Sequence, residues 1–183
     1  MEKKRAGLLV KDKKGHVRVQ PITGEDFSKV PVLNYLDCNV KKLPCNSKAV
    51  VKYEILRRRG EDKNTYNTVE IKEVSPEGYN LRNVEKIIEI SKGILSLEKL
   101  LTDALEKSQD FRTCFNNAKV YLAEGNHKDA KSCIELAFNG CGDMMFKGNL
   151  KDNSKEIYHD LYSNLSKVNN SLLALDLLGK TFN

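Results

Sequence analysis

Apolar and polar residues alternate with a period of two in several short stretches between residues 6 and 74. The stretch from His16 to Gln20 reads His-Val-Arg-Val-Gln, and a longer alternating stretch runs from Ala49 to Leu56. A period of two places successive side chains on opposite faces of a strand. The pattern therefore predicts strands with one buried face and one solvated face.

Turn-forming residues separate these stretches and set the number of strands. Residues 12–15, 21–24, 43–47 and 60–64 are rich in Gly, Pro, Asp and Asn. The predicted strands lie near residues 6–10, 16–21, 30–36, 48–58 and 66–74, with no helical pattern of useful length between them. Five strands without room for crossover helices favour a small antiparallel five-stranded β-barrel, OB-type or SH3-like, because closure removes exposed sheet edges.

The hydrophobic period changes to three and four residues after Ser75-Pro76-Glu77-Gly78, which we interpret as a domain boundary. Gly93 is expected to weaken the first helix or to separate it from the next one. Further predicted helices cover residues 111–124, 128–139, 154–167 and 171–179. The sequence thus predicts an α+β chain with a basic β-barrel domain over residues 1–78 and an all-α helical-hairpin domain over residues 79–183.

The segment NNAKVYLAEGNHKDAKSCIELAFNGCG, residues 116–142, has small residues where two helices would approach each other and a glycine where the first would end. It resembles a tetratricopeptide repeat, whose pattern is matched here by Ala118, Tyr121, Gly125, Ala130, Ile134 and Ala137. The Trp and Leu expected in the first turn are Cys114 and Asn117, and the closing proline is absent. The resemblance predicts a tetratricopeptide-like hairpin in this segment.

Copies one repeat earlier and one repeat later are expected if this hairpin belongs to an array. A shift of 34 residues places Ser91 at the position of Gly125 in the earlier copy. Ser166 takes that position in the later copy if residues 140–153 form a longer loop. An array of this kind implies a concave surface for a protein partner. The alternative is an unrelated helical bundle whose middle hairpin has converged on the pattern.

The excess of positive over negative charge lies entirely in the first 80 residues of the chain. Residues 1–80 contain 17 Lys and Arg against 11 Asp and Glu, whereas residues 81–183 contain 14 of each. Such an asymmetry suggests that one region meets a polyanion and the other does not.

The basic residues of the predicted barrel are candidates for a single-stranded nucleic-acid site, because barrels of this type often bind RNA or DNA in a basic groove. Lys14-Gly15-His16-Val17-Arg18-Val19 resembles the Lys-Gly-Phe-Gly-Phe-Ile strand of cold-shock domains, with His16 and Arg18 at the two outward stacking positions. The same residues also suit a generic hairpin entry. The candidate contacts are Lys14, His16, Arg18, Lys52, Arg57, Arg58 and Arg59.

Three tyrosines and the arginine triplet of the predicted barrel can each be interpreted either as ligand contacts or as structural residues. Tyr35, Tyr53 and Tyr66 are possible stacking platforms, but Tyr53 shares strand parity with Val51 and Ile55 and is expected in the core. The arginine triplet precedes a predicted hairpin tip, where it is either a phosphate clamp or a solvated basic end.

No motif in the sequence indicates catalysis, a metal site or a cofactor. The three histidines and five cysteines lack the spacing of metal ligands, and His127 is interpreted as an exposed turn residue. Cys141, between two glycines, is a reactive thiol only if a base lies nearby. No apolar run has membrane-spanning length, so we expect a cytoplasmic protein with reduced thiols.

The function that these patterns predict is that of a noncatalytic adaptor. Its barrel would bind RNA or single-stranded DNA, and its helical-repeat module would bind a protein partner. The alternative is a purely protein-binding subunit or inhibitor of a larger assembly, because positive charge also attracts acidic protein surfaces. A third class, an enzyme with an unfamiliar site, requires His, Asp and Cys to converge in the fold.

Overall fold

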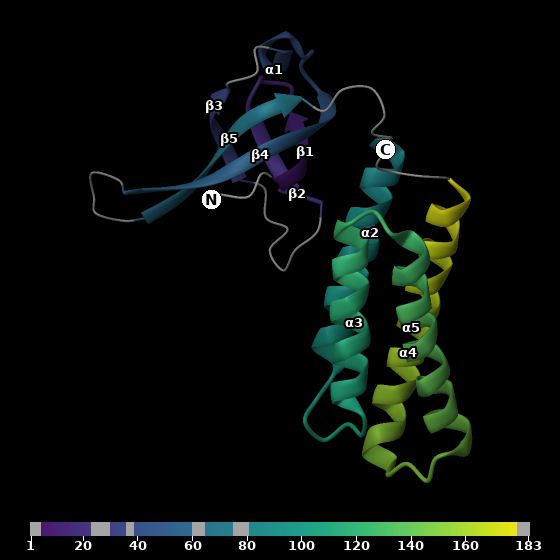
Figure 1. Ribbon diagram of the computed structural model, residues 1–183. Coiled ribbons are helices and arrows are strands. Elements are labelled where there is room, and N and C mark those ends of the chain that lie inside the picture. The colour runs from purple at the N-terminus through teal and green to yellow at the C-terminus, as the bar shows by residue number, and fades with distance from the viewer. Residues whose placement is uncertain (1–4, 23–29, 36–38, 60–64, 75–80, 179–183) are drawn as a thin grey trace. The chain divides into compact units, whose positions relative to one another are not determined.

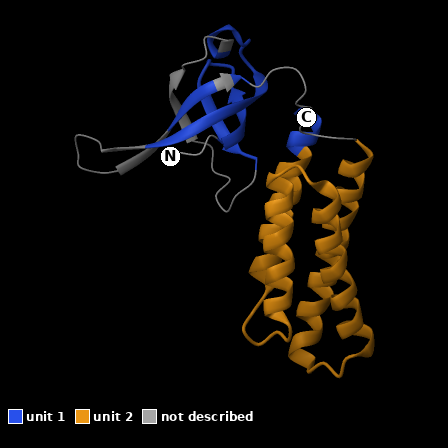
Figure 2. Ribbon diagram, in the orientation of Figure 1, with its two compact units in different colours: residues 1–85, 181–183 blue, residues 86–180 orange. Residues whose placement is uncertain are grey.

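The computed structural model describes residues 5–22, 30–35, 39–59, 65–74 and 81–178 of the chain. The chain divides into two compact units, residues 1–85 with 181–183 and residues 86–180, which Figure 2 shows in different colours. The α+β class is confirmed, since a curled sheet precedes a set of helices. The predicted boundary after residue 78 lies within residues 75–80, outside the described residues.

The first unit is built from five strands and one short helix (Figure 1). In chain order they are β1 Arg5–Lys11, β2 Val17–Pro21, β3 Val30–Tyr35, α1 Asn39–Lys42, β4 Ser47–Arg59 and β5 Thr65–Val74. Strands β2, β1, β4 and β5 form a continuous antiparallel sheet. Strand β3 joins its two edges, so the strands follow the order β1-β2-β3-β5-β4.

Two details of the first unit differ from the predicted sheet. The prediction that all strands are antiparallel is wrong, because β3 and β5 pair in parallel from Val32↔Val69 to Tyr35↔Ile71. The chain leaves β3, crosses through α1 and returns on the far side of β1, so that β5 meets β3 in the same direction. Helix α1 was not predicted, since four residues are too few to display a helical period.

The core of the first unit consists of inward-facing residues from four strands and from α1. Leu9, Val19, Val51 and Ile71 are buried at alternate strand positions, and Val40 of α1 joins them. Tyr53 is only 2% exposed and belongs to this cluster. Its expected place in the core is confirmed.

Tyr53 fits because a glycine lies against its ring. A Cβ atom at Gly7 would lie 2.6 Å from Tyr53 Cε1 and 2.6 Å from Val19 Cγ1. Both atoms belong to buried side chains, which have little room to retreat. Gly7 therefore leaves the space that the phenol ring occupies.

The opposite face of the sheet is not uniformly solvated. Leu8 pairs with Gln20 on one side and with Val50 on the other, and all three residues are buried. Their strand positions alternate with those of the core residues Leu9, Val19 and Val51. A buried row thus crosses the outer face of β2, β1 and β4.

The helices that follow are fewer and longer than predicted. They are α2 Leu81–Leu100, α3 Ser108–Ala123, α4 His127–Lys147 and α5 Asp152–Leu177. Two expected helices, 154–167 and 171–179, are parts of the single helix α5. Among the described residues, no helix is long and apolar enough to cross a membrane.

The predicted hairpin around Gly125 is present as α3 and α4. Gly125 has a φ of 75°, a left-handed conformation that favours glycine, and the Asn126 side chain caps α4 by accepting a hydrogen bond from Asp129 N at 3.2 Å. Ala118 and Ala130 are fully buried. These small residues allow the two helices to pack closely.

The expected earlier and later hairpins are not formed, because α2 continues through Ser91 and α5 continues through Ser166. Gly93 does not break α2 but lies against α5, where an added Cβ would be 2.9 Å from Val168 Cγ2. Helix α2 also contacts α3 through Glu98 and Lys119, whose charged atoms are 2.8 Å apart. Helix α4 packs against both α3 and α5.

Candidate nucleic-acid interface

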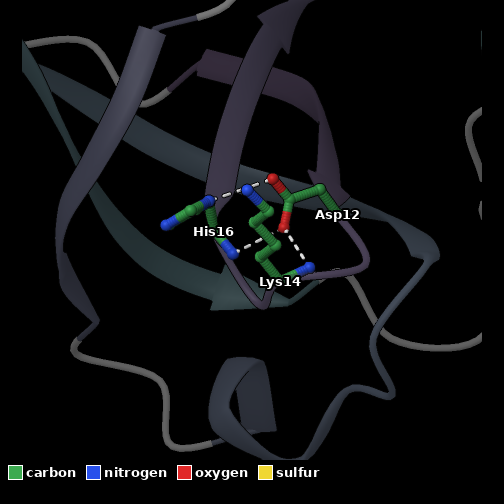
Figure 3. Close-up of polar contacts among 3 residues, drawn as sticks. All are labelled: Asp12, Lys14 and His16. Carbon is green, nitrogen blue, oxygen red and sulfur yellow. Dashed lines mark hydrogen bonds and ion pairs between the residues drawn. The ribbon is translucent and has the colours of Figure 1, made fainter.

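The turn between β1 and β2 is organised by one acidic side chain, Asp12 (Figure 3). Its Oδ1 accepts hydrogen bonds from Lys14 N at 2.8 Å and His16 N at 2.9 Å, and its Oδ2 lies 3.1 Å from His16 Nδ1. Gly15 N donates to Asp12 O at 3.1 Å, and Gly15 adopts a φ of 84°. The turn therefore has a defined geometry, with Lys14 and His16 held on either side of the glycine.

The hydrogen bonds at Asp12 stabilise its charged form. Desolvation raises the pKa of the Asp12 carboxyl, but hydrogen bonds from His16 and Lys14, together with the charge of His16, outweigh it. The pKa consequently lies below its ordinary value of 3.8. The turn carries this one carboxylate among several basic residues.

Lys14, His16 and Arg18 are exposed and lie close together in the chain. Arg18 alternates with Val17 and Val19, both of which are buried in the core, so it lies on the outer face of β2. Among the described residues, neither Lys14 nor Arg18 forms an ion pair. His16 and Arg18 are therefore accessible to solvent, and their predicted role in base stacking stays a prediction.

The connection from α1 to β4 lies beside this turn. Asn46 N donates to Asp12 O at 3.2 Å, and Lys11 Nζ donates to Leu43 O at 2.7 Å. A Cβ added at Gly15 would be 3.9 Å from Cys45 Sγ, and Cys45 is exposed. Lys11 is thus occupied in holding the end of α1 and is not part of the open basic surface.

Lys52 lies apart from Arg18, although both are on the outer face of the sheet. Arg18 is in register with Val10, and Lys52 is in register with Ala6. These positions on β1 are roughly 13 Å apart at the rise of a strand. The buried row of Leu8, Gln20 and Val50 separates them, and Lys52 is itself half-buried. The structure does not bring Lys52 into the surface formed by His16 and Arg18.

The arginine triplet lies on a two-stranded part of the sheet. Strand β1 pairs with β4 only as far as Tyr53, and β3 pairs with β5 from Val69 onward. Among the described residues, Leu56–Arg59 therefore pairs only with Thr65–Thr68. We call these eight residues the arm; Figure 1 shows β4 and β5 extending beyond the other strands. The side chains of Arg57, Arg58 and Arg59 lie outside the described part of the structure.

Two glutamates lie next to the base of the arm. Glu54 and Glu70 are opposite each other in register, and Lys72 Nζ lies 3.0 Å from Glu54 Oε2 and 2.5 Å from Glu70 Oε2. Hydrogen bonds from Lys72, to Glu70 first and then to Glu54, raise the pKa of the lysine. This cluster of two acids and one base interrupts the basic surface between Lys52 and the arginine triplet.

Other predicted roles change once burial is known. Tyr53 is in the core and offers no stacking surface, while the Tyr35 and Tyr66 side chains lie outside the described part of the structure. His127 is buried and not exposed as predicted, and burial lowers its pKa despite the charge of Asp176. The described residues contain no group of three His, Cys, Asp or Glu side chains placed to hold a metal ion.

Cys141 is a structural residue. Its side chain is fully buried, and Sγ donates to Tyr158 O at 3.3 Å. Burial raises the pKa of the Cys141 thiol to about 12. The thiolate that a reactive cysteine requires is therefore not formed at neutral pH.

The role of Asp12 was missed in the sequence, although a signal for it is present. Asp-Lys-Lys-Gly, residues 12–15, has an aspartate at the first position of a turn, where its side chain commonly accepts hydrogen bonds from the backbone that follows. From charge alone, Asp12 is expected to reduce the attraction of a basic site for a polyanion. The structure shows that it positions the neighbouring basic residues.

No protein-family model matches this chain, and no curated protein matches it either.

Proposed function

We propose that the protein is a noncatalytic adaptor that binds RNA or single-stranded DNA on its first unit and a protein partner on its helices. The observation that carries the first part is the exposed trio Lys14, His16 and Arg18 on the β1–β2 turn and β2. In OB-type barrels the faces of the second and third strands, with the loops joining the first to the second and the fourth to the fifth, bind oligonucleotides.

The strand order supports an OB-type barrel of cold-shock character. The strands follow the order β1-β2-β3-β5-β4, with α1 between β3 and β4. In this arrangement His16 offers a ring for base stacking, and Lys14 and Arg18 offer charges to the phosphate backbone. The arginine triplet belongs to the arm, which leads into the connection between β4 and β5, and a second set of phosphate contacts at this connection is part of the proposal.

A second candidate function is a purely protein-binding subunit or inhibitor. The observation that favours it is the Glu54–Lys72–Glu70 cluster, since a surface with both signs of charge suits a protein better than a polyanion. In this version the β1–β2 turn meets an acidic protein surface and binds no nucleic acid.

Titration of the full chain with a fluorescent oligonucleotide decides between the two. Single strands of roughly 12 nucleotides and the matching duplex are compared at about 50 mM and about 200 mM salt. We expect the single strand to bind more tightly, with an affinity that falls as salt increases. Binding that stays absent at the lower salt concentration rejects the nucleic-acid function and leaves the protein-binding one.

Two substitutions test whether the nucleic-acid site lies at the β1–β2 turn. Arg18→Ala is expected to weaken binding and to reduce the salt slope by roughly 0.7 to 1, the contribution of one phosphate contact. The matched control is Lys99→Ala, which removes an equal charge from an exposed position on α2. Equal losses in the two variants indicate a nonspecific attraction and contradict a site at the β1–β2 turn.

A further inference from the structure

The two nitrogen atoms of the His16 ring have different surroundings. Nδ1 lies 3.1 Å from Asp12 Oδ2, and Figure 3 shows the second nitrogen, Nε2, on the side of the ring that faces away from Asp12. Among the residues that the structure describes, Nε2 has no hydrogen-bond partner. The side chain of His16 is 69% exposed, so Nε2 is open to a ligand.

Asp12 determines which of the two nitrogens carries a hydrogen atom. Although desolvation raises the pKa of the Asp12 carboxyl, hydrogen bonds from His16 and Lys14 hold that pKa below its ordinary value. An ionised carboxylate only accepts hydrogen bonds, so His16 Nδ1 has to be the donor. In the neutral form of the ring, Nδ1 therefore carries the hydrogen atom and Nε2 carries a free electron pair.

The free electron pair gives His16 a different chemistry from that of its basic neighbours. Lys14 and Arg18, which are also exposed, have only hydrogen-bond donors, and these suit the oxygen atoms of phosphate groups. The phosphate of a nucleic-acid backbone has no hydrogen atom to give and carries a negative charge. Nε2 of a neutral His16 is consequently suited to a donor group of the ligand and not to its phosphate.

A nucleic-acid single strand offers two kinds of donor to such an acceptor. The bases carry N–H groups on their Watson–Crick edges, and the ribose of RNA carries a 2′-hydroxyl. A histidine ring that stacks on one base directs its own edge, and with it Nε2, towards the neighbouring nucleotide.

We propose that Asp12 is a positioning residue that makes His16 a hydrogen-bond acceptor, through which the β1–β2 turn recognises a donor group of a nucleotide, a base N–H or the 2′-hydroxyl. This inference rests on the nucleic-acid half of the proposed function. It adds a contact that depends on the chemistry of the nucleotide, whereas Lys14 and Arg18 hold any phosphate backbone alike.

The substitution Asp12→Asn separates this inference from a simple effect of charge. The single oxygen of the asparagine side chain can keep the two backbone hydrogen bonds that Asp12 Oδ1 accepts, and its NH2 group then takes the place of Oδ2. This NH2 group donates to His16 Nδ1, so the ring hydrogen moves to Nε2 and the acceptor is lost. Removal of a negative charge by itself strengthens the attraction to every polyanion and leaves the preference among strands of equal charge unchanged.

NMR spectroscopy of the full-length protein tests the state of the ring without a ligand. At about pH 8, where an ordinary imidazole is neutral, the 15N resonances of His16 are expected to place the hydrogen on Nδ1 in the natural protein and on Nε2 in Asp12→Asn. Asp103→Asn removes an equal charge from an exposed position and is expected to keep the hydrogen on Nδ1. A hydrogen on Nε2 of the natural protein, or an unchanged ring in Asp12→Asn, overturns the inference.

Three single strands of roughly 12 nucleotides test the contact with the ligand at the same pH. The first is oligouridine RNA, whose nucleotides have only the base N3–H and the 2′-hydroxyl as donors. The second is its 2′-deoxy counterpart, which lacks the hydroxyl, and the third is oligo-3-methyluridine, which lacks the N3–H. The natural protein is expected to bind one of the modified strands about threefold to tenfold more weakly than oligouridine, the effect of one lost hydrogen bond. A loss with the deoxy strand assigns the contact to the ribose, and a loss with the methylated strand assigns it to the base.

Variants show whether this discrimination comes from His16. His16→Phe keeps a ring for stacking but has no nitrogen, and it is expected to bind the unmodified and modified strands equally. Asp12→Asn is expected to lose the discrimination as well. Arg18→Ala is expected to weaken the binding of all three strands by the same factor, and Asp103→Asn serves as the charge control. Both of these are expected to keep the discrimination.

Two outcomes overturn the inference and leave the proposed function in place. One is equal binding of the three strands by the natural protein. The other is discrimination that persists in His16→Phe, because it then arises from another residue. If none of the strands binds, the nucleic-acid half of the proposed function is rejected, and this inference is rejected with it.

Discussion

At the scale of single residues, the packing of Tyr53 depends on the absence of a side chain at Gly7. The Cβ of Gly7→Ala would overlap both Tyr53 and Val19, each at 2.6 Å. Overpacking of this kind typically costs about 1–3 kcal/mol. We therefore predict that Gly7→Ala lowers the free energy of unfolding, as measured by urea denaturation with amide hydrogen exchange in the first unit.

A matched substitution in the helices controls for the general effect of adding a methyl group. Gly140→Ala places its Cβ 3.9 Å from Phe111 Cε1, an ordinary contact, within helix α4. Helix propensity predicts a gain of up to about 1 kcal/mol there. If Gly7→Ala is as stable as the natural protein, Tyr53 does not pack as described.

Asp12 links the stability of the β1–β2 turn to pH. Because its pKa in the folded protein lies below 3.8, its hydrogen bonds stabilise the fold above that pH, and this contribution is lost as the pH falls through the folded value. The stability difference between the natural protein and Asp12→Asn is expected to shrink over that acidic range. Unfolding curves at a series of pH values test this, together with NMR titration of the carboxyl carbon.

An Asp12 carboxyl that titrates at or above 3.8 would contradict the hydrogen-bonded turn. The matched substitution is Asp103→Asn, which removes an equal charge from an exposed position between α2 and α3 and leaves the hydrogen bonds of the β1–β2 turn in place.

At the scale of elements, the α3–α4 hairpin depends on the cap at Asn126. The Asn126 side chain accepts a hydrogen bond from Asp129 N, and the backbone N–H groups at a helix start have no partner within the helix. We predict that Asn126→Ala destabilises the hairpin by about 1 kcal/mol, measured as faster amide exchange in α3 and α4. Asn126→Ser keeps an acceptor and is expected to recover most of the loss; equal losses would assign the effect to another contact.

The strands could be predicted closely from the sequence because each one carries its own signal. Alternation with a period of two is local, and the expected strand at 48–58 differs from β4 by only one residue at each end. The parallel pairing of β3 with β5 has no local signal, because it depends on the path of the chain between them. The separation of Lys52 from Arg18 also has no local signal. It depends on Leu8, which is buried on the outer face between them, and the sequence does not distinguish such a residue from an apolar residue of the core.

The helical elements were predicted in class but not in number. Separate helices were predicted over residues 154–167 and 171–179, yet α5 continues because Leu165, Val168, Leu172 and Leu175 form one buried stripe along it. The earlier hairpin was inferred by stepping one repeat length along the chain and the later one by adding a longer loop to that step, and only a true repeat keeps such a period. The aromatic cluster of Phe138, Phe146 and Tyr162 joins residues 16 or more positions apart on two helices, and no sequence motif marks it.

At the scale of the whole molecule, the uneven distribution of charge predicts that two kinds of ligand act on separate parts of the chain. NMR shifts caused by an oligonucleotide are expected at residues 12–18 and absent from α3 to α5. A protein partner of the helices is expected to give the reverse pattern. Shifts from both ligands at the same residues would show that one surface serves both and would contradict a division of roles.

The arm has a further consequence for the behaviour of the protein at high concentration. Because its two strands pair only with each other among the described residues, their outer edges offer unpaired backbone groups to any other strand. Charged residues on such edges oppose strand addition, since like charges would meet across the new pair. Replacing Arg57, Arg58 and Arg59 together by threonine is expected to cause aggregation, which light scattering would detect. The corresponding triple lysine variant is expected to stay monodisperse. The arginine triplet is thus expected to keep the arm from pairing with the arm of another copy, whichever ligand the protein meets.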